Sequence, residues 1–171
     1  MTKPSEETRA AAGMLEAAFP KVKLDPKSAV GDAKATFLDY QAFAKDSNGR
    51  DWSQLDWEYL ELNREAIGFL TPKGLADYLP ALLSAAIVHY DEVDVLPTFI
   101  AAGLTRCTDE PARLARFDEL AGHLDESQQK AVATALAELH RLAANPHPEA
   151  VTKVALERSY WRKLLPKKKR K

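Results

Sequence analysis

The sequence predicts an all-α fold: a compact single domain of about seven short helices with crossed packing, followed by a disordered basic tail. Three observations lead to this prediction. Apolar residues recur at helical spacing while strand alternation hardly appears, prolines and capping residues divide the chain into short segments, and five consecutive cations end it. The length of 171 residues suits one domain with its own core.

The first expected helix begins after Ser5, whose hydroxyl can cap it, and ends at Pro20. Its apolar stripe would consist of Met14, Leu15, Ala18 and Phe19. A second helix is expected after Asp32, with one face formed by Phe37, Tyr40 and Ala44 and with its end in the turn cluster Asp46-Ser47-Asn48-Gly49.

Asp56 is expected to cap a short helix that carries Trp57, Leu60 and Leu62. Thr71 followed by Pro72 is a strong helix start, because the hydroxyl accepts a free backbone amide and proline needs none at the first position. The apolar positions that follow have helical spacing: Leu75, Tyr78, Leu79, Leu82, Leu83 and Ala86. Pro80 lies within them, so we expect this helix to kink or break there.

Pro97 and Pro111 each look like a proline in the first turn of a further helix. Asp125 with Gln128 resembles a capping box before another apolar stripe. The sequence Asn145-Pro146-His147-Pro148 interrupts the chain, and a last helix would carry Val151, Val154, Ala155, Trp161 and Leu165.

Several stretches resemble a family of bacterial domains known only as a domain of unknown function. The most specific runs from Phe69-Leu70-Thr71-Pro72 to Tyr78-Leu79-Pro80, although Gly74-Leu75 departs from the usual pattern. Supporting stretches are Leu15 to Phe19, Asp51-Trp52 with Leu55, Asp94 to Pro97, Leu124 to Val132, and Ala155-Leu156-Glu157 with Tyr160-Trp161. The resemblance spans most of residues 15–161 and implies a shared helical fold and a bacterial source. It implies no activity, cofactor or catalytic residue.

The net charge of −1 conceals a division between residues 1–161, the helical domain, and residues 162–171, the basic tail. The tail carries seven cations and no anion, which leaves a net charge of −8 on the domain. An acidic domain repels phosphate, so any contact with a polyanion is expected only through the tail. Its cations are Arg162, Lys163, Lys167, Lys168, Lys169, Arg170 and Lys171.

The chain reads as a soluble, cytoplasmic protein. Lone Cys107 excludes an intrachain disulfide and is interpreted as a small buried hydrophobe. Glu6, Glu7 and Glu16 lie where a secretory signal would need a basic start and an apolar run. The longest uncharged stretch, Tyr78 to Tyr90, is too short for a membrane span.

No catalytic, metal or cofactor motif is recognised. His89, Asp91 and Glu92 cluster after the apolar run, but they lack a recurring ligand spacing, so we interpret them as a polar helix end with a capping imidazole. His140 reads as a helix C-terminal residue and His123 as a turn residue. The four Asp-Glu pairs at 91–92, 109–110, 118–119 and 125–126 read as surface and helix-start charges, and the aromatic side chains near residues 52–78 as core.

Three functional hypotheses follow. The leading one is a non-catalytic helical binding protein whose acidic surface engages a protein partner, as an immunity or adaptor protein does. The alternative is a nucleic-acid-associated accessory protein anchored by residues 162–171. The third is an enzyme with a site at His89, Asp91 and Glu92. The tail itself reads as a native polyanion-seeking segment, as an appended import-like signal, or as a segment that folds back on the acidic domain.

Overall fold

In the computed structural model, the described residues are 3–25, 29–30, 43, 45–143, 152–153, 155–156 and 160–166. They form six α-helices and three 3-10 helices, and their only β-pairing is two isolated bridges, Lys23 with Asp51 and Val30 with Leu70. The predicted all-α fold is therefore confirmed. Most of the helix expected after Asp32 and the break at residues 145–148 lie outside the described residues, but residues 45–47 are helical and Asn48-Gly49 forms the expected turn after them.

From residue 52 to residue 142 the helices follow one another with short connections. The α-helices are α1 (Glu6–Ala18), α4 (Trp57–Leu62), α5 (Pro72–Val88), α6 (Leu96–Gly103), α7 (Pro111–Gly122) and α8 (Glu126–Leu142). The 3-10 helices are η2 (Trp52–Gln54), η3 (Arg64–Gly68) and η4 (Trp161–Leu164).

The predicted helix starts are confirmed by their hydrogen bonds. The Ser5 hydroxyl accepts from the Thr8 amide at 3.2 Å, and the Thr71 hydroxyl accepts from the Gly74 amide at 3.0 Å. Asp125 forms the full capping box with Gln128 at the start of α8. Pro97 and Pro111 lie in the first turns of α6 and α7. These local signals decide where the helices begin because each one satisfies or removes a free amide.

Helix α5 is the centre of the core, and it corrects one expectation: it runs unbroken from Pro72 to Val88 with Pro80 inside it. Proline removes one intrahelical hydrogen bond, but residues on every side of this helix are buried, Pro80 included. Packing around the whole circumference keeps the helix continuous where its local sequence would favour a break.

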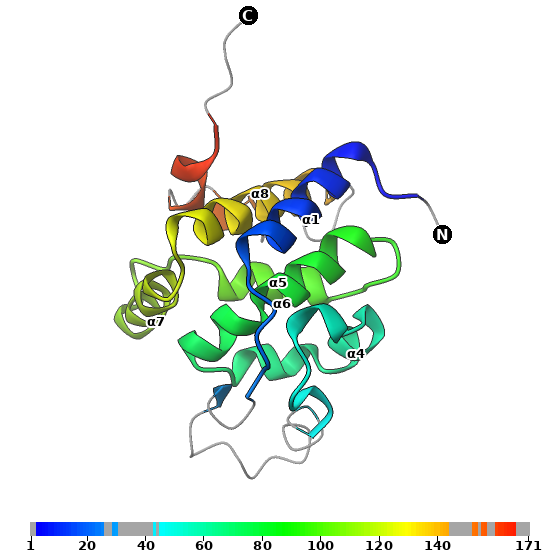
Figure 1. Cartoon of the computed structure of the whole chain (residues 1–171). Coiled ribbons are helices and arrows are strands. Elements are labelled where there is room, and N and C mark those ends of the chain that lie inside the picture. The colour runs from blue at the N-terminus through cyan, green and yellow to red at the C-terminus, as the bar shows by residue number, and fades with distance from the viewer. Residues whose placement is uncertain are drawn as a thin grey trace, which may run out of the picture.

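The other helices surround α5. Helices α1 and α8 lie side by side and both pack on α5, and η4 packs on α8 (Figure 1). Helix α7 is seen nearly end-on in the view that shows α1 and α8 from the side, so it crosses them steeply (Figure 1). On the opposite side of α5 lie α4, η2 and α6. The arrangement is the crossed packing expected for short helices.

Helices α1 and α8 are joined by a buried polar group. Glu138, only 6% exposed, accepts hydrogen bonds from the Thr8 hydroxyl at 2.6 Å and from Arg141 at 2.6 and 2.8 Å. The guanidinium of Arg141 also donates to Ser5 at 3.0 Å. The buried stripe of α1 therefore includes a threonine, whereas the predicted stripe residue Met14 is 40% exposed.

The C-terminal part of the described chain is anchored by an aromatic cluster. The indole nitrogen of Trp161 donates to the Leu104 carbonyl at 2.8 Å, and its ring packs edge-on against Phe117 and Tyr160. Trp161 lies in the 3-10 helix η4, while Ala155 and Leu156 of the expected last helix are helical and buried.

Candidate functional site

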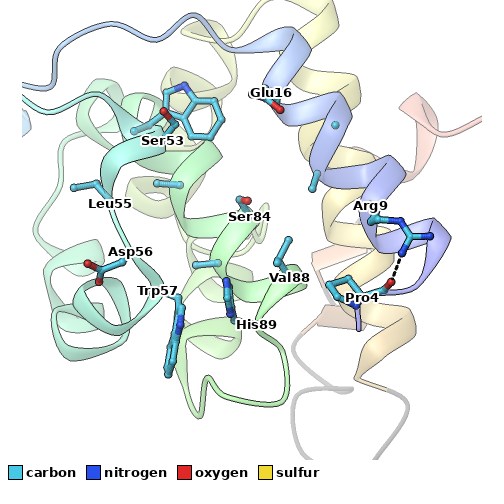
Figure 2. Close-up of a pocket in the computed structure, with 15 residues that line it drawn as sticks. Pro4, Arg9, Glu16, Ser53, Leu55, Asp56, Trp57, Ser84, Val88 and His89 are labelled. Carbon is cyan, nitrogen blue, oxygen red and sulfur yellow. Dashed lines mark hydrogen bonds between the residues drawn. The ribbon is translucent and has the colours of Figure 1, made fainter. Parts of the chain in front are cut away.

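A groove of about 510 Å³ lies between α1, α5 and the segment of residues 52–57. Figure 2 shows α1 with Arg9 and Glu16 on one side, Ser84 of α5 at the base, and Leu55 and Trp57 on the other side. We call this hollow the α1–α5 groove. Its volume lies within the range of ligand-binding pockets, roughly 300–1,000 Å³.

Both helices present small side chains to the groove at intervals of three, four and seven residues. On α1 the lining residues are Arg9, Ala12, Gly13 and Glu16, and on α5 they are Ala81, Ser84, Ala85 and Val88. This interval places residues on one face of a helix. A Cβ atom built at Gly13 would meet nothing within 4 Å, so the space next to α1 is open.

The third wall comes from the segment that leads into α4. Asp51 forms a capping box on η2, and the Asp56 carboxylate accepts from the Tyr59 amide at 2.7 Å. Two capped helix starts within six residues fix this backbone, and Trp52 and Trp57 contribute their rings to the groove. Of the aromatic residues predicted as core, Trp52 and Tyr78 are buried and Trp57 and Tyr59 pack against the core, whereas Phe69 is half-buried.

His89 stands at the end of α5, where its ring stacks on Trp57 with 5.5 Å between centroids. The backbone amide of His89 caps the helix by donating to the Ala85 carbonyl, whereas the predicted capping role of its imidazole is wrong. Buried Nδ1 of His89 has no hydrogen-bond partner, and neither does the indole nitrogen of Trp52.

The structure separates the three residues of the enzyme hypothesis. His89 lines the α1–α5 groove, whereas Asp91 and Glu92 line a second hollow of about 210 Å³ with Arg141. No group of three metal-binding side chains occurs among the described residues. His140 pairs with Thr152 instead, with 3.1 Å between Nδ1 and the hydroxyl.

The remaining predictions for single residues hold. His123 follows α7 in a turn, and Cys107 is a buried free thiol, 4% exposed. Asp109, Glu110, Asp118 and Glu119 are exposed, as expected for surface charges.

Acidic charge is concentrated in one segment of the sequence. Residues 51–104 carry nine carboxylates and two cations, a net −7 out of the −8 of residues 1–161. In α4 and η3, three of these carboxylates recur at intervals of three and four residues. We call the carboxylates on and beside α4 and η3 the acidic face and define it as Asp56, Glu58, Glu61, Glu65 and Asp94; Glu61 also pairs with Arg64 at 3.5 Å.

Glu61 connects the two halves of the acidic face. Its carboxylate accepts from the backbone amides of Asp94, Val95 and Leu96 at 3.2–3.4 Å, at the start of α6 where Val95 offers no capping side chain. Leu62 of α4 follows Glu61 and is 80% exposed. Asp56 lines the α1–α5 groove and also caps α4, so the groove and the acidic face adjoin.

The basic end of the chain lies elsewhere. Arg162 and Lys163 are exposed on η4, which is far from α4 in Figure 1. The other five cations, Lys167 to Lys171, lie outside the described residues. Among the residues that the structure describes, the cations Arg162 and Lys163 therefore lie apart from the acidic face.

Neither the groove nor the concentration of charge was predicted from the sequence. The charge concentration, the second of these, could have been found by counting charges in segments, because the carboxylates of residues 51–104 are present in the sequence. The first could not, since it depends on how α1 meets α5 and residues 52–57. No helix in the described part of the chain has the length and hydropathy needed to cross a membrane.

A search of the curated proteins and a search of the solved structures found nothing similar. The model of a family of unknown function, DUF6714, matches residues 10–165, from within α1 to the end of η4. The chain belongs to this family, in agreement with the resemblance read from its sequence.

Proposed function

We propose that this protein is a non-catalytic helical binding protein that engages a basic protein partner through its acidic face, as an immunity or adaptor protein does. The observation that carries the proposal is the acidic face on and beside α4, in a segment (residues 51–104) of net charge −7, with Leu62 80% exposed in the same helix. An exposed apolar side chain within a charged rim is the usual composition of a protein interface. The expected location is the bacterial cytoplasm, where Cys107 stays reduced.

Electrostatics favour such a partner on physical grounds. Carboxylates of one sign on one face create a local potential that attracts a basic surface and speeds its association. Because exposed charges are screened beyond a Debye length of about 8 Å at physiological salt, this association is expected to weaken as salt rises.

The second candidate function is nucleic-acid association through residues 162–171. Exposed Arg162 and Lys163 beside five further cations support it, and their distance from the acidic face would let both surfaces act. Deleting residues 162–171 should then abolish retention on a DNA column, whereas equal retention of the full and shortened chains would exclude this function.

The main test is affinity purification from the source cells at low salt. One variant removes three charges from the acidic face: Glu58→Gln, Glu65→Gln and Asp94→Asn. A matched control removes three exposed charges elsewhere: Glu6→Gln, Glu119→Gln and Glu126→Gln.

The proposal expects a stoichiometric partner with the unmodified protein and with the control, and a loss with the acidic-face variant. Each charge removed near the contact should lower the association rate, and added salt should remove the difference between the variants. Equal capture by the two variants, or no stoichiometric partner with the unmodified protein, would contradict the proposal.

A further inference from the structure

We propose that the α1–α5 groove receives a basic amphipathic helix from the partner. This inference rests on the proposed function and adds the structural form in which the partner binds. It is carried by the shape of the groove, by its aromatic wall and by the charge at its mouth.

The shape suits a helix. The lining positions of α1 and α5 recur at helical intervals and are small over most of their length: Ala12, Gly13, Ala81, Ser84 and Ala85. Small residues let another helix approach to the usual distance of about 8–10 Å between axes. Recognition of an amphipathic helix in an apolar groove is a recurrent binding mode, with anchors at the third, fourth and seventh positions.

The wall opposite α1 offers anchor positions for apolar side chains. Trp57 lies along it, stacked on His89, and Trp52 lies at residues 52–54 with only 7% of its surface exposed. Interface hot spots are enriched in tryptophan at positions that surround a buried contact.

The charge at the mouth selects a basic occupant. Glu16 and Asp56 lie on opposite sides of the groove (Figure 2); Glu16 forms an exposed ion pair with Lys21 at 3.3 Å, and the acidic face continues from Asp56 along α4. Among the lining residues, Arg9 supplies a positive charge. Its guanidinium donates to the Pro4 carbonyl at 2.7 Å (Figure 2). A helix with one apolar face and lysines or arginines on the other therefore complements the site, whereas an acidic helix or a phosphate is repelled.

The test uses a defined probe: a synthetic peptide with leucines at every third or fourth position and lysines on the opposite face. A peptide of the same composition in scrambled order has the same charge but no apolar face. Two of the three tryptophans of the chain line the groove, so their fluorescence reports on its occupation.

The blocking variant is Gly13→Leu, because a side chain there enters the open space beside α1 without a clash. Its control is Gly122→Leu, since Gly122 ends α7, lies outside the groove and also has nothing within 4 Å of a built Cβ. Replacing glycine within a helix favours the helix, so both variants should fold. Circular dichroism and thermal unfolding check that they do.

We expect saturable binding of the amphipathic peptide with a shift in tryptophan emission. We expect binding at least about tenfold weaker to Gly13→Leu, unchanged binding to Gly122→Leu, and weaker binding of the scrambled peptide. Equal affinity for both glycine variants, equal affinity for both peptides, or the absence of binding would overturn the inference.

Other occupants give distinct results, each of which also overturns it. A dimer of the unmodified protein that Gly13→Leu dissociates would assign the groove to a second copy of the chain. Peptide binding that appears only after deletion of residues 167–171 would assign it to the chain's own basic end. If the natural partner is lost with the acidic-face variant but retained by Gly13→Leu, the proposed function stands and the groove inference fails.

Discussion

Replacing Glu138 by glutamine should destabilise the protein by weakening the connection between α1 and α8. The carboxylate is 6% exposed and accepts three hydrogen bonds, one from Thr8 across to α1 and two from Arg141. Glutamine has nearly the same shape, so the substitution tests the charge and the second acceptor rather than the packing. One amide oxygen can still accept from Thr8.

The size of the effect follows from these contacts. A hydrogen bond to a charged group contributes about 1.5–3 kcal/mol, and leaving a buried group unpaired costs a similar amount. The guanidinium of Arg141 is 49% exposed, so water takes over part of its interaction when the charge is removed. We therefore expect a loss of about 2 kcal/mol in the free energy of unfolding. For a chain of this length that lowers the melting temperature by about 4–8 °C.

The loss should depend on pH. The hydrogen bonds from Arg141, and then from Thr8, hold the pKa of Glu138 below its ordinary value of 4.5. A lowered pKa in the folded state stabilises the protein fully above pH 4.5, and this contribution disappears as the pH falls through the folded-state value. The difference in melting temperature between the unmodified protein and Glu138→Gln should therefore narrow below pH 4.5.

The assay is thermal unfolding followed by circular dichroism across a pH series, with Glu126→Gln as control. Glu126 also pairs with a cation on α8, Lys130 at 2.7 Å, but its carboxylate is 81% exposed. Its replacement should cost less than about 0.5 kcal/mol. If Glu138→Gln is no more destabilising than Glu126→Gln, or if its effect grows as the pH falls, the buried carboxylate does not have the role assigned to it.

Two further predictions concern the packing around α5 and α6. Glu61→Gln should speed hydrogen exchange at the first amides of α6 by about fivefold, equivalent to about 1 kcal/mol, because the charged cap of that helix is lost; unchanged exchange would mean that water caps the helix equally well. Gly74→Ala should destabilise the protein by about 1–3 kcal/mol, since its Cβ would stand 2.4 Å from the Ala29 carbonyl oxygen. Gly13→Ala, with open space around it, should instead stabilise by about 0.5–1 kcal/mol, and equal melting temperatures for the two alanine variants would refute the close approach.

The sequence predicted helix starts well because each depends on residues adjacent in the chain. Ser5, Asp56, Thr71 and Asp125 all cap the helices expected of them. It also predicted the buried face of α5, whose six stripe residues are all buried, but it was wrong at one position of α1. Met14 was assigned to a buried stripe and is exposed, because the side of α1 that meets α8 is decided by Thr8 and its bond to Glu138, 130 residues away.

Of the candidate site, only the charge could have been predicted from the sequence. The carboxylates of residues 51–104 are visible in the sequence, although their concentration there was not noticed. The imidazole of His89 was expected to cap α5, but Trp57 comes from another helix and provides a stacking surface for it. Asp91 and Glu92 follow His89 closely in the chain, yet the turn after α5 directs them to a different hollow.

The sequence by itself determined that this chain forms short capped helices, that acidic residues dominate its domain and that cations dominate its end. These properties can be read from the sequence because a capping residue binds amides only a few residues away, and because a net charge is a sum over residues. Only the tertiary structure decided that α5 continues through Pro80, that Glu138 becomes a buried link, and that α1, α5 and residues 52–57 enclose a groove. Each of these depends on contacts between residues far apart in the chain, whose packing energy exceeds local preferences of about 1–3 kcal/mol.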